Sequence, residues 1–101
     1  MDPIKQSFNG SKKEIMDAFP AALAKLNMPQ WGRSDRLGLI SMKQKDEPFL
    51  YAHIVERSES STDVFISPGI SYLKDRGSTK RPDSKIERIM ETLKAELNKK
   101  G

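Results

Sequence analysis

Residues 49–57 read Phe-Leu-Tyr-Ala-His-Ile-Val-Glu-Arg, and this stretch decides the fold. Successive side chains of a β-strand point to opposite faces, so the stretch separates into two sets of side chains. Both sets are largely apolar or aromatic: Phe49, Tyr51, His53 and Val55 on one face, and Leu50, Ala52 and Ile54 on the other. A strand that is apolar on both faces is typical of a sheet interior. We therefore expect a central strand, with helices against one face and the other face partly covered or used for contact.

Turn signals on both sides of this strand predict its neighbours. Asp46-Glu47-Pro48 separates it from an earlier strand at 37–45, and Glu59-Ser60-Ser61 leads into a later strand at 62–67. Connections this short favour antiparallel hairpins. A short alternating pattern at residues 4–9 predicts one further strand, which opens the chain.

A helix is predicted directly after the opening strand. Ser11 followed by Glu14 matches a capping box, in which a hydroxyl and a carboxylate each accept a hydrogen bond from an exposed amide. Pro20 lacks the amide that would bond to the carbonyl of Met16, so we expect either a kinked continuous helix or two short helices. An unbroken apolar stripe favours the continuous helix: Ile15, Phe19, Leu23 and Leu26, widened by Met16 and Ala22.

A second helix is predicted at the end of the chain. Ser84 with Glu87 forms another capping box. The apolar residues that follow recur at helical spacing: Ile86, Ile89, Met90, Leu93 and Leu97.

The predicted order is strand, helix, three strands, helix. The polar stretch that contains Trp31, between Pro29 and Arg36, is interpreted as a connection. Two amphipathic helices must bury their apolar stripes, and an antiparallel sheet of about four strands is the surface that can receive them. We therefore predict an α+β fold, a two-layer sandwich of β-α-β-β-β-α order with both helices packed on one face.

Length and composition restrict the class of protein. The 101 residues allow one domain, 1–101, and no apolar run is long enough for a membrane-spanning helix. The absence of cysteine excludes disulfides, thiolate metal sites and cysteine nucleophiles. The glycines form no phosphate-binding motif, so we expect no cofactor.

The sequence offers little support for catalysis. His53 is the only histidine, and no acidic residue lies two positions from it. We interpret His53 as a sheet residue that a cross-strand neighbour or solvent satisfies. We expect a protein that is not an enzyme.

The connection at 68–82 is the first candidate binding region, because it is long, basic and expected to be flexible. The chain has 18 Lys and Arg against 14 Asp and Glu, a formal charge of +4. Such a loop can contact the phosphates of a nucleic acid or of an anionic lipid. The candidate anion-binding residues are Lys74, Arg76, Lys80, Arg81 and Lys85.

Apolar side chains outside the expected stripes are the second candidate. Those in the loop must fold back on the domain or meet a partner, and Tyr51 lies on the second face of the central strand. The candidate interaction residues are Tyr51, Ile70, Tyr72 and Leu73.

Four segments resemble small bacterial envelope lipoproteins of unknown function: residues 11–18, 22–26, 62–69 and 85–89. They are also similar to the helix-grip domains of the lipoprotein component of the outer-membrane β-barrel assembly machinery. The resemblance implies a helix after the first strand, an antiparallel meander and a final helix against the sheet. It implies a non-enzymatic envelope domain that binds a protein or a small ligand. It does not indicate which residues would form a site.

We therefore expect a non-enzymatic protein- or ligand-interaction module of the bacterial cell envelope, with polyanion binding through residues 74–85 as the alternative. The expected partner is another protein, and nucleic acid or anionic lipid is the second choice. If a signal sequence once preceded Met1, the expected location is the periplasm or envelope, and otherwise it is the cytoplasm.

Overall fold

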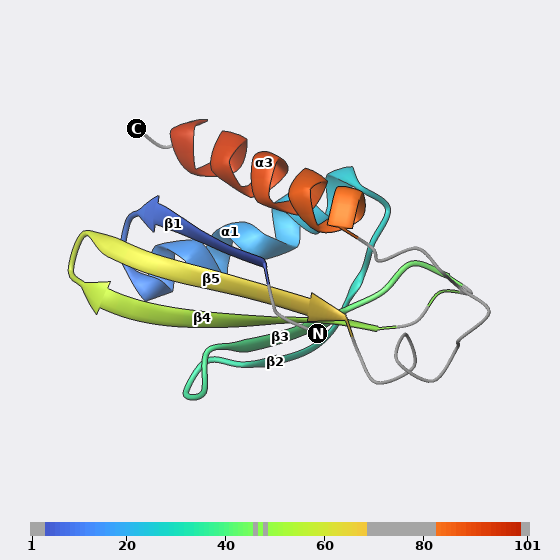
Figure 1. Cartoon of the computed structure of the whole chain (residues 1–101), viewed down its shortest axis with the longest axis horizontal. Helices are drawn as coiled ribbons and strands as arrows, with labels where there is room; N and C mark the ends of the chain where they lie inside the picture. The colour runs from blue at the N-terminus through green and yellow to red at the C-terminus, as the bar shows by residue number, and fades with distance from the viewer. Residues whose placement is uncertain (1–3, 46, 48, 69–82, 100–101) are drawn as a thin grey trace.

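A computed structural model of the chain describes residues 4–45, 47, 49–68 and 83–99, and shows an α+β fold (Figure 1). The elements follow one another as β1 (Ile4–Asn9), α1 (Lys12–Lys25), β2 (Gln30–Ser34), β3 (Leu39–Met42), β4 (Leu50–Ser58), β5 (Ser61–Pro68) and α3 (Asp83–Lys99). The predicted class and both helices are therefore confirmed. α3 begins at Asp83, so Ser84 lies inside its first turn and does not precede the helix as predicted.

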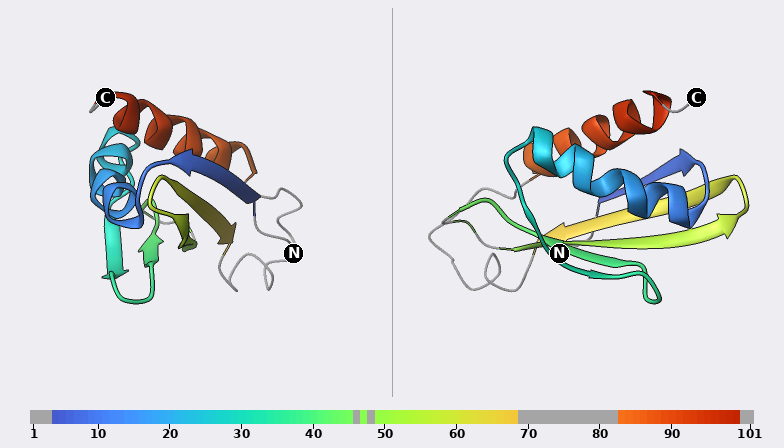
Figure 2. Two further views of the ribbon diagram at one scale, coloured as in Figure 1. Left: turned by 90° about the vertical axis from the view of Figure 1, so that its left-hand side faces the viewer. Right: turned by 180° about the vertical axis from the view of Figure 1, so that it is seen from behind.

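The strands form one antiparallel sheet in the order β1-β5-β4-β3-β2. β4 is the middle strand, as its two apolar faces predict. It pairs Leu39 of β3 with His53, and on its other side it pairs His53 with Phe65 of β5. Both helices lie on the same face of this sheet, and we call that side the covered face (Figures 1 and 2). The opposite side, which neither described helix crosses, is the open face.

The described sheet has five strands, one more than the predicted number of about four, and the additional strand is β2. Residues 30–34 pair with β3 through a hairpin, although the sequence analysis treats them as a connection. β2 lacks the alternation of apolar side chains that marks a strand, and a bulge between Gln30 and Gly32 interrupts its register. Its pairing with β3 comes from the hairpin and not from an apolar pattern of its own.

The core lies between the helices and the covered face. Ile54 of β4 and Ile66 of β5 belong to the covered face and are almost completely buried in this core. Phe19, at the centre of the α1 stripe, is also fully buried. The other core residues from the helices are Ile15, Met16, Ala18, Ala22, Leu23, Ile86, Ile89, Met90 and Leu93. The predicted stripes are thus the surfaces that the helices bury.

α1 is one continuous helix through Pro20, and Arg33 of β2 contacts it at the point that proline disturbs. The predicted capping box is present, since Ser11 Oγ accepts from the Glu14 amide and Glu14 accepts from the Ser11 amide. Pro20 has no amide to donate to the carbonyl of Met16, four residues earlier. Arg33 Nη1 donates to that carbonyl at 3.1 Å. The β2 strand therefore satisfies an acceptor that the helix leaves open.

Gly38 holds the β2–β3 hairpin close to β4. Its φ of +67° lies in the left-handed region, and a Cβ there would lie 2.4 Å from the carbonyl oxygen of Ile54. The amide of Ile54 donates to the carbonyl of Gly38 at 2.7 Å. Only glycine meets both conditions, the positive φ and the close approach of backbone, without strain.

The flexible basic loop predicted at 68–82 lies, apart from Pro68, outside the described residues. Within the described ranges, no helix is both long and apolar enough to cross a bilayer.

Candidate functional site

Three aromatic side chains lie in contact on the open face, and we call them the aromatic row: Trp31, Phe49 and Tyr51. Trp31 comes from β2, Tyr51 comes from β4, and Phe49 directly precedes β4. Trp31 is 61% exposed and Tyr51 is 46% exposed. Phe49 is half-buried and contacts both. Exposure of two large aromatic side chains on an uncovered sheet marks this row as a candidate binding surface.

The rings of the row are arranged as a chain. The Trp31 and Phe49 centroids are 5.8 Å apart with the planes at 83°, an edge-to-face contact. The Phe49 and Tyr51 centroids are 6.0 Å apart with the planes at 26°, close to parallel. Both distances lie within the range in which aromatic pairs attract each other. The contacts hold the row in place without burying it.

Lys43 places a positive charge on the row. Its ammonium nitrogen lies 5.3 Å from the centroid of Trp31 and 5.3 Å from that of Phe49. A cation at this distance from a ring is attracted by the negative potential of the ring. The side chain of Lys43 is half-buried. An anionic group that approaches the row therefore meets an ammonium that the aromatic rings already position.

The strand register brings these residues together from distant parts of the chain. Gln30 pairs with Met42 and Gly32 with Ser41, so Trp31 is the extra residue of the β2 bulge. A bulge changes the direction in which a side chain points. Gly32 also keeps this region open, because a Cβ there would lie 2.7 Å from the hydroxyl oxygen of Ser41. Trp31 consequently contacts Phe49, the residue directly before β4.

A shallow groove of about 500 Å³ continues the open face from Tyr51 across the sheet. Leu39 is 40% exposed at one side of it, and Phe65 is half-buried at the other. The groove is lined by Leu39, Tyr51, Ala52, His53, Val55, Arg57, Phe65 and Ser67. The open face is thus mainly apolar and aromatic along β3, β4 and β5.

A polar cluster lies at the β1 side of the open face, around Asp63. Ser7 Oγ donates to Asp63 Oδ1 at 2.6 Å, and Arg57 Nε donates to Oδ2 at 2.8 Å. These two bonds hold the pKa of Asp63 below its usual value, and the bond from Ser7 has the larger effect. Among the five described strands, Asp63 is the only carboxylate on the open side, and both of its oxygens accept hydrogen bonds.

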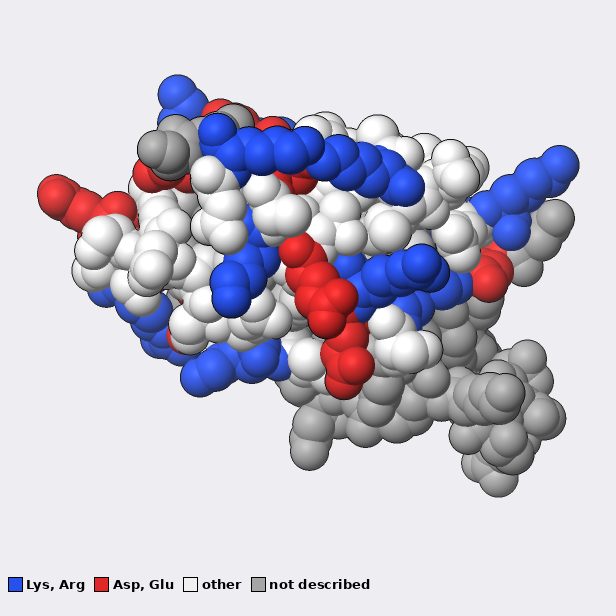
Figure 3. All heavy atoms as spheres, turned by 90° about the horizontal axis from the view of Figure 1, so that it is seen from above, with Lys and Arg blue, Asp and Glu red and all other residues white. Residues whose placement is uncertain are grey.

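The two sides of the molecule differ in charge. Seen from the helices, basic and acidic side chains lie side by side (Figure 3). The strands and their ends place Lys5, Lys43 and Arg57 on the open face, against the single buried Asp63. The open face therefore has a positive excess in addition to its exposed aromatic rings.

Of the residues predicted for a site, the structure describes Tyr51 and Lys85. Tyr51 belongs to the aromatic row, whereas Lys85 lies in the first turn of α3 and forms an ion pair with Glu47. The remaining predicted residues lie outside the described part of the chain: Ile70, Tyr72, Leu73, Lys74, Arg76, Lys80 and Arg81. Lys43 is not among the predicted site residues, although its alternation with Leu39 and Ser41 places it on the same side of the chain.

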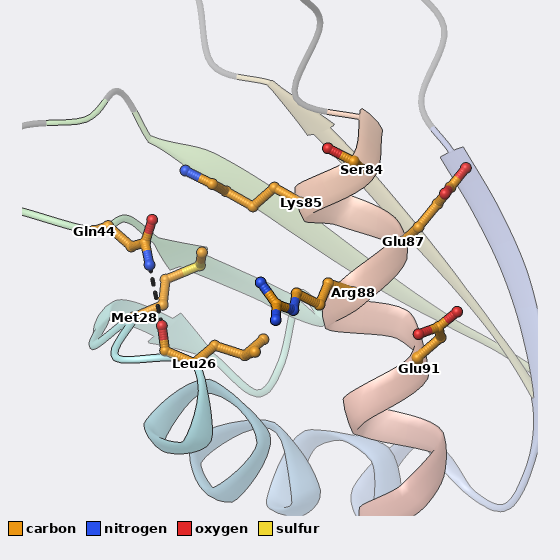
Figure 4. Close-up of a pocket in the computed structure, with 8 residues that line it drawn as sticks. All are labelled: Leu26, Met28, Gln44, Ser84, Lys85, Glu87, Arg88 and Glu91. Carbon is orange, nitrogen blue, oxygen red and sulfur yellow. Dashed lines mark hydrogen bonds between the residues drawn. The ribbon is translucent and has the colours of Figure 1, made fainter.

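A second hollow, of about 450 Å³, lies between the end of α1 and the first half of α3 (Figure 4). Lys85 and Arg88 extend from α3 over it, and Gln44 Nε2 donates to the carbonyl of Leu26 at 3.1 Å. Burial lowers the pKa of Lys85. Glu87 and Glu91 also line the hollow, so its two cations are matched by two carboxylates. Because the charges balance, the hollow favours neither an anionic nor a cationic ligand. The open face is therefore the stronger candidate for a binding site.

Neither a hydrogen-bonded histidine nor a metal-binding cluster occurs among the described residues. His53 is exposed on the open face between Leu39 and Phe65, and no described side chain forms a hydrogen bond with it. In the same residues, no three His, Cys, Asp or Glu side chains gather as a metal site.

Comparisons with known proteins add no assignment. No protein-family model matches the chain, and no curated protein matches it.

Proposed function

We propose that the chain is a non-enzymatic interaction module and that the open face, centred on the aromatic row, is its binding surface. The observation that carries this proposal is the exposure of Trp31 and Tyr51 on a face that neither α1 nor α3 covers. Tryptophan and tyrosine are enriched among the few residues that provide most of the binding energy of an interface, because each buries a large rigid area on contact.

The alternative surface, the basic segment 74–85, has less support from the described residues. Of its candidate anion-binding residues the structure describes only Lys85, and Glu47 already compensates the charge of Lys85. The open face combines exposed aromatic rings with the positive charge of Lys43. The ammonium of Lys43 lies over the rings of Trp31 and Phe49. The location in the bacterial envelope stays a prediction from the resemblance.

A paired substitution tests whether the open face binds. Trp31→Ser together with Tyr51→Ser removes both exposed rings of the row. The matched control is Leu37→Ser, because Leu37 is 52% exposed and lies in the turn at the other end of the β2–β3 hairpin. Wild-type, double-variant and control proteins are immobilised and incubated with an extract of the source cells. Circular dichroism confirms that all three are folded.

We expect wild-type protein and the Leu37→Ser control to retain the same components, protein or nucleic acid, and the double variant to lose them. Equal retention by the double variant would show that binding does not depend on the aromatic row.

A further inference from the structure

We infer that the open face binds single-stranded nucleic acid, with bases stacked on the aromatic row and phosphates near Lys43 and Arg57. The inference rests on the proposed function, because it names the partner of the same surface. It is carried by the combination of stackable rings and a positive excess on one face, where Lys5, Lys43 and Arg57 stand against the one strand carboxylate, Asp63.

The rings have the exposure that stacking requires. Every base has a flat π-face, and proteins that bind single strands stack successive bases on aromatic side chains. Trp31 and Tyr51 stand at the two ends of the row, with Phe49 between them. The bases of a duplex are already stacked on one another and cannot reach a flat sheet, so the row selects unpaired bases.

The charges have the sign and position that phosphates require. Lys43 holds its ammonium over the row, and Arg57 and Lys5 continue the positive charge across β4 and β1. The single carboxylate, Asp63, is 8% exposed and accepts bonds from Ser7 and Arg57. A polyanion would therefore approach this face without meeting a free carboxylate from the strands.

The same charges disfavour two other occupants. A second copy of the chain, packed face to face, would bring Lys5, Lys43 and Arg57 of both copies together, and opposed like charges weaken association. A protein partner usually meets aromatic residues but few lysines at the centre of an interface. Here Lys43 lies 5.3 Å from two rings of the row, so a protein partner would meet a lysine next to the aromatic residues.

Trp31 provides a direct measurement, because it is the only tryptophan in the chain. A base that stacks on its ring quenches its fluorescence, so binding at the row is distinguished from binding elsewhere. The probe is an oligothymidylate of about 12 nucleotides, which lies within the site size of small single-strand binding domains. A duplex of the same length is the comparison, and dye-labelled oligonucleotide anisotropy measures total binding.

We expect saturable quenching of Trp31 by the single strand and weaker binding of the duplex. Tyr51→Ser should weaken single-strand binding about 5- to 150-fold, the equivalent of one lost base stack. Lys43→Gln should reduce the slope of log affinity against log salt by about 0.7, the value for one phosphate contact on a single strand. Lys13→Gln is the matched control, because it removes an exposed charge on α1. It should leave the affinity for the single strand unchanged.

Three results would overturn the inference. Anisotropy without quenching, unaffected by Tyr51→Ser, would locate nucleic acid binding outside the open face. No oligonucleotide binding, combined with loss of a retained protein by the Trp31→Ser and Tyr51→Ser double variant, would assign the open face to a protein and leave the proposed function intact. No binding of oligonucleotide and no difference in retention would remove both proposals.

Discussion

The two faces of the sheet are made by the same strands but have opposite environments. Along β4, Leu50, Ala52 and Ile54 are at most 2% exposed on the covered face, whereas Tyr51 is 46% exposed on the open face. Both sets of side chains are apolar or aromatic, so composition does not explain the difference. The covered face has the amphipathic helices α1 and α3 against it, and neither of these described helices lies on the open face. An apolar sheet face that lacks a cover is the feature that favours an external partner.

The largest effect should come from the covered face. Ile54→Ala removes a buried side chain and leaves a cavity in the core, so we expect a loss of about 2–5 kcal/mol in the free energy of unfolding. Tyr51→Ala on the same strand removes one ring contact, and we expect about 0.5–1.5 kcal/mol. Urea unfolding measures both. Equal losses would mean that the open face is packed as tightly as the covered one.

A medium effect should come from Arg33, which reaches from the edge strand β2 to the covered side. Arg33→Met leaves the Met16 carbonyl without its donor, and we expect a loss of about 1–2 kcal/mol in urea unfolding. In a Pro20→Ala background the helix supplies its own amide, so the same substitution should cost about 0.5–1.5 kcal/mol less. An identical cost in both backgrounds would show that Arg33 acts through Asp17 and Asp35 instead.

The smallest effect concerns the one polar cluster of the open face and depends on pH. The pKa of Asp63 is lowered in the folded chain, so its ionised form stabilises the fold above its unfolded value of about 3.9. That stabilisation is lost as the pH falls through the lowered folded pKa. We therefore expect the stability of wild-type protein to fall below about pH 4.

Asp63→Asn should lose less stability over the same pH range, because the amide does not titrate. Chemical unfolding at a series of pH values makes the comparison. If the variant's stability falls as steeply as that of wild type, the bonds from Ser7 and Arg57 do not couple Asp63 to folding.

Much of the covered face could be predicted from the sequence because its signals are local. The Ser11 and Glu14 capping box locates the start of α1, and the apolar stripes of both helices identify the surfaces that they bury. The two apolar faces of residues 49–57 predict a central strand, and β4 is the middle strand of the sheet. Each of these signals depends on spacings of a few residues along one element.

The aromatic row could be predicted only in part. Tyr51 and Phe49 belong to one strand pattern, so their common face follows from alternation. Trp31 lies in a segment without such a pattern, and β2 is recognised only through its pairing with β3. The contact of Trp31 with Phe49 and Lys43 requires the hairpin, the bulge and the register of β3 on β4 together.

The sequence by itself determined the α+β class, the start of α1, the buried helix stripes and the absence of thiol chemistry. These follow from short-range periodicity, capping and composition. Only the tertiary structure decided that β2 joins the sheet, that Arg33 satisfies the carbonyl opposite Pro20, and that Trp31, Phe49, Tyr51 and Lys43 form one surface. The physical reason is that these contacts join residues of different elements, and strand register and helix placement bring such residues together.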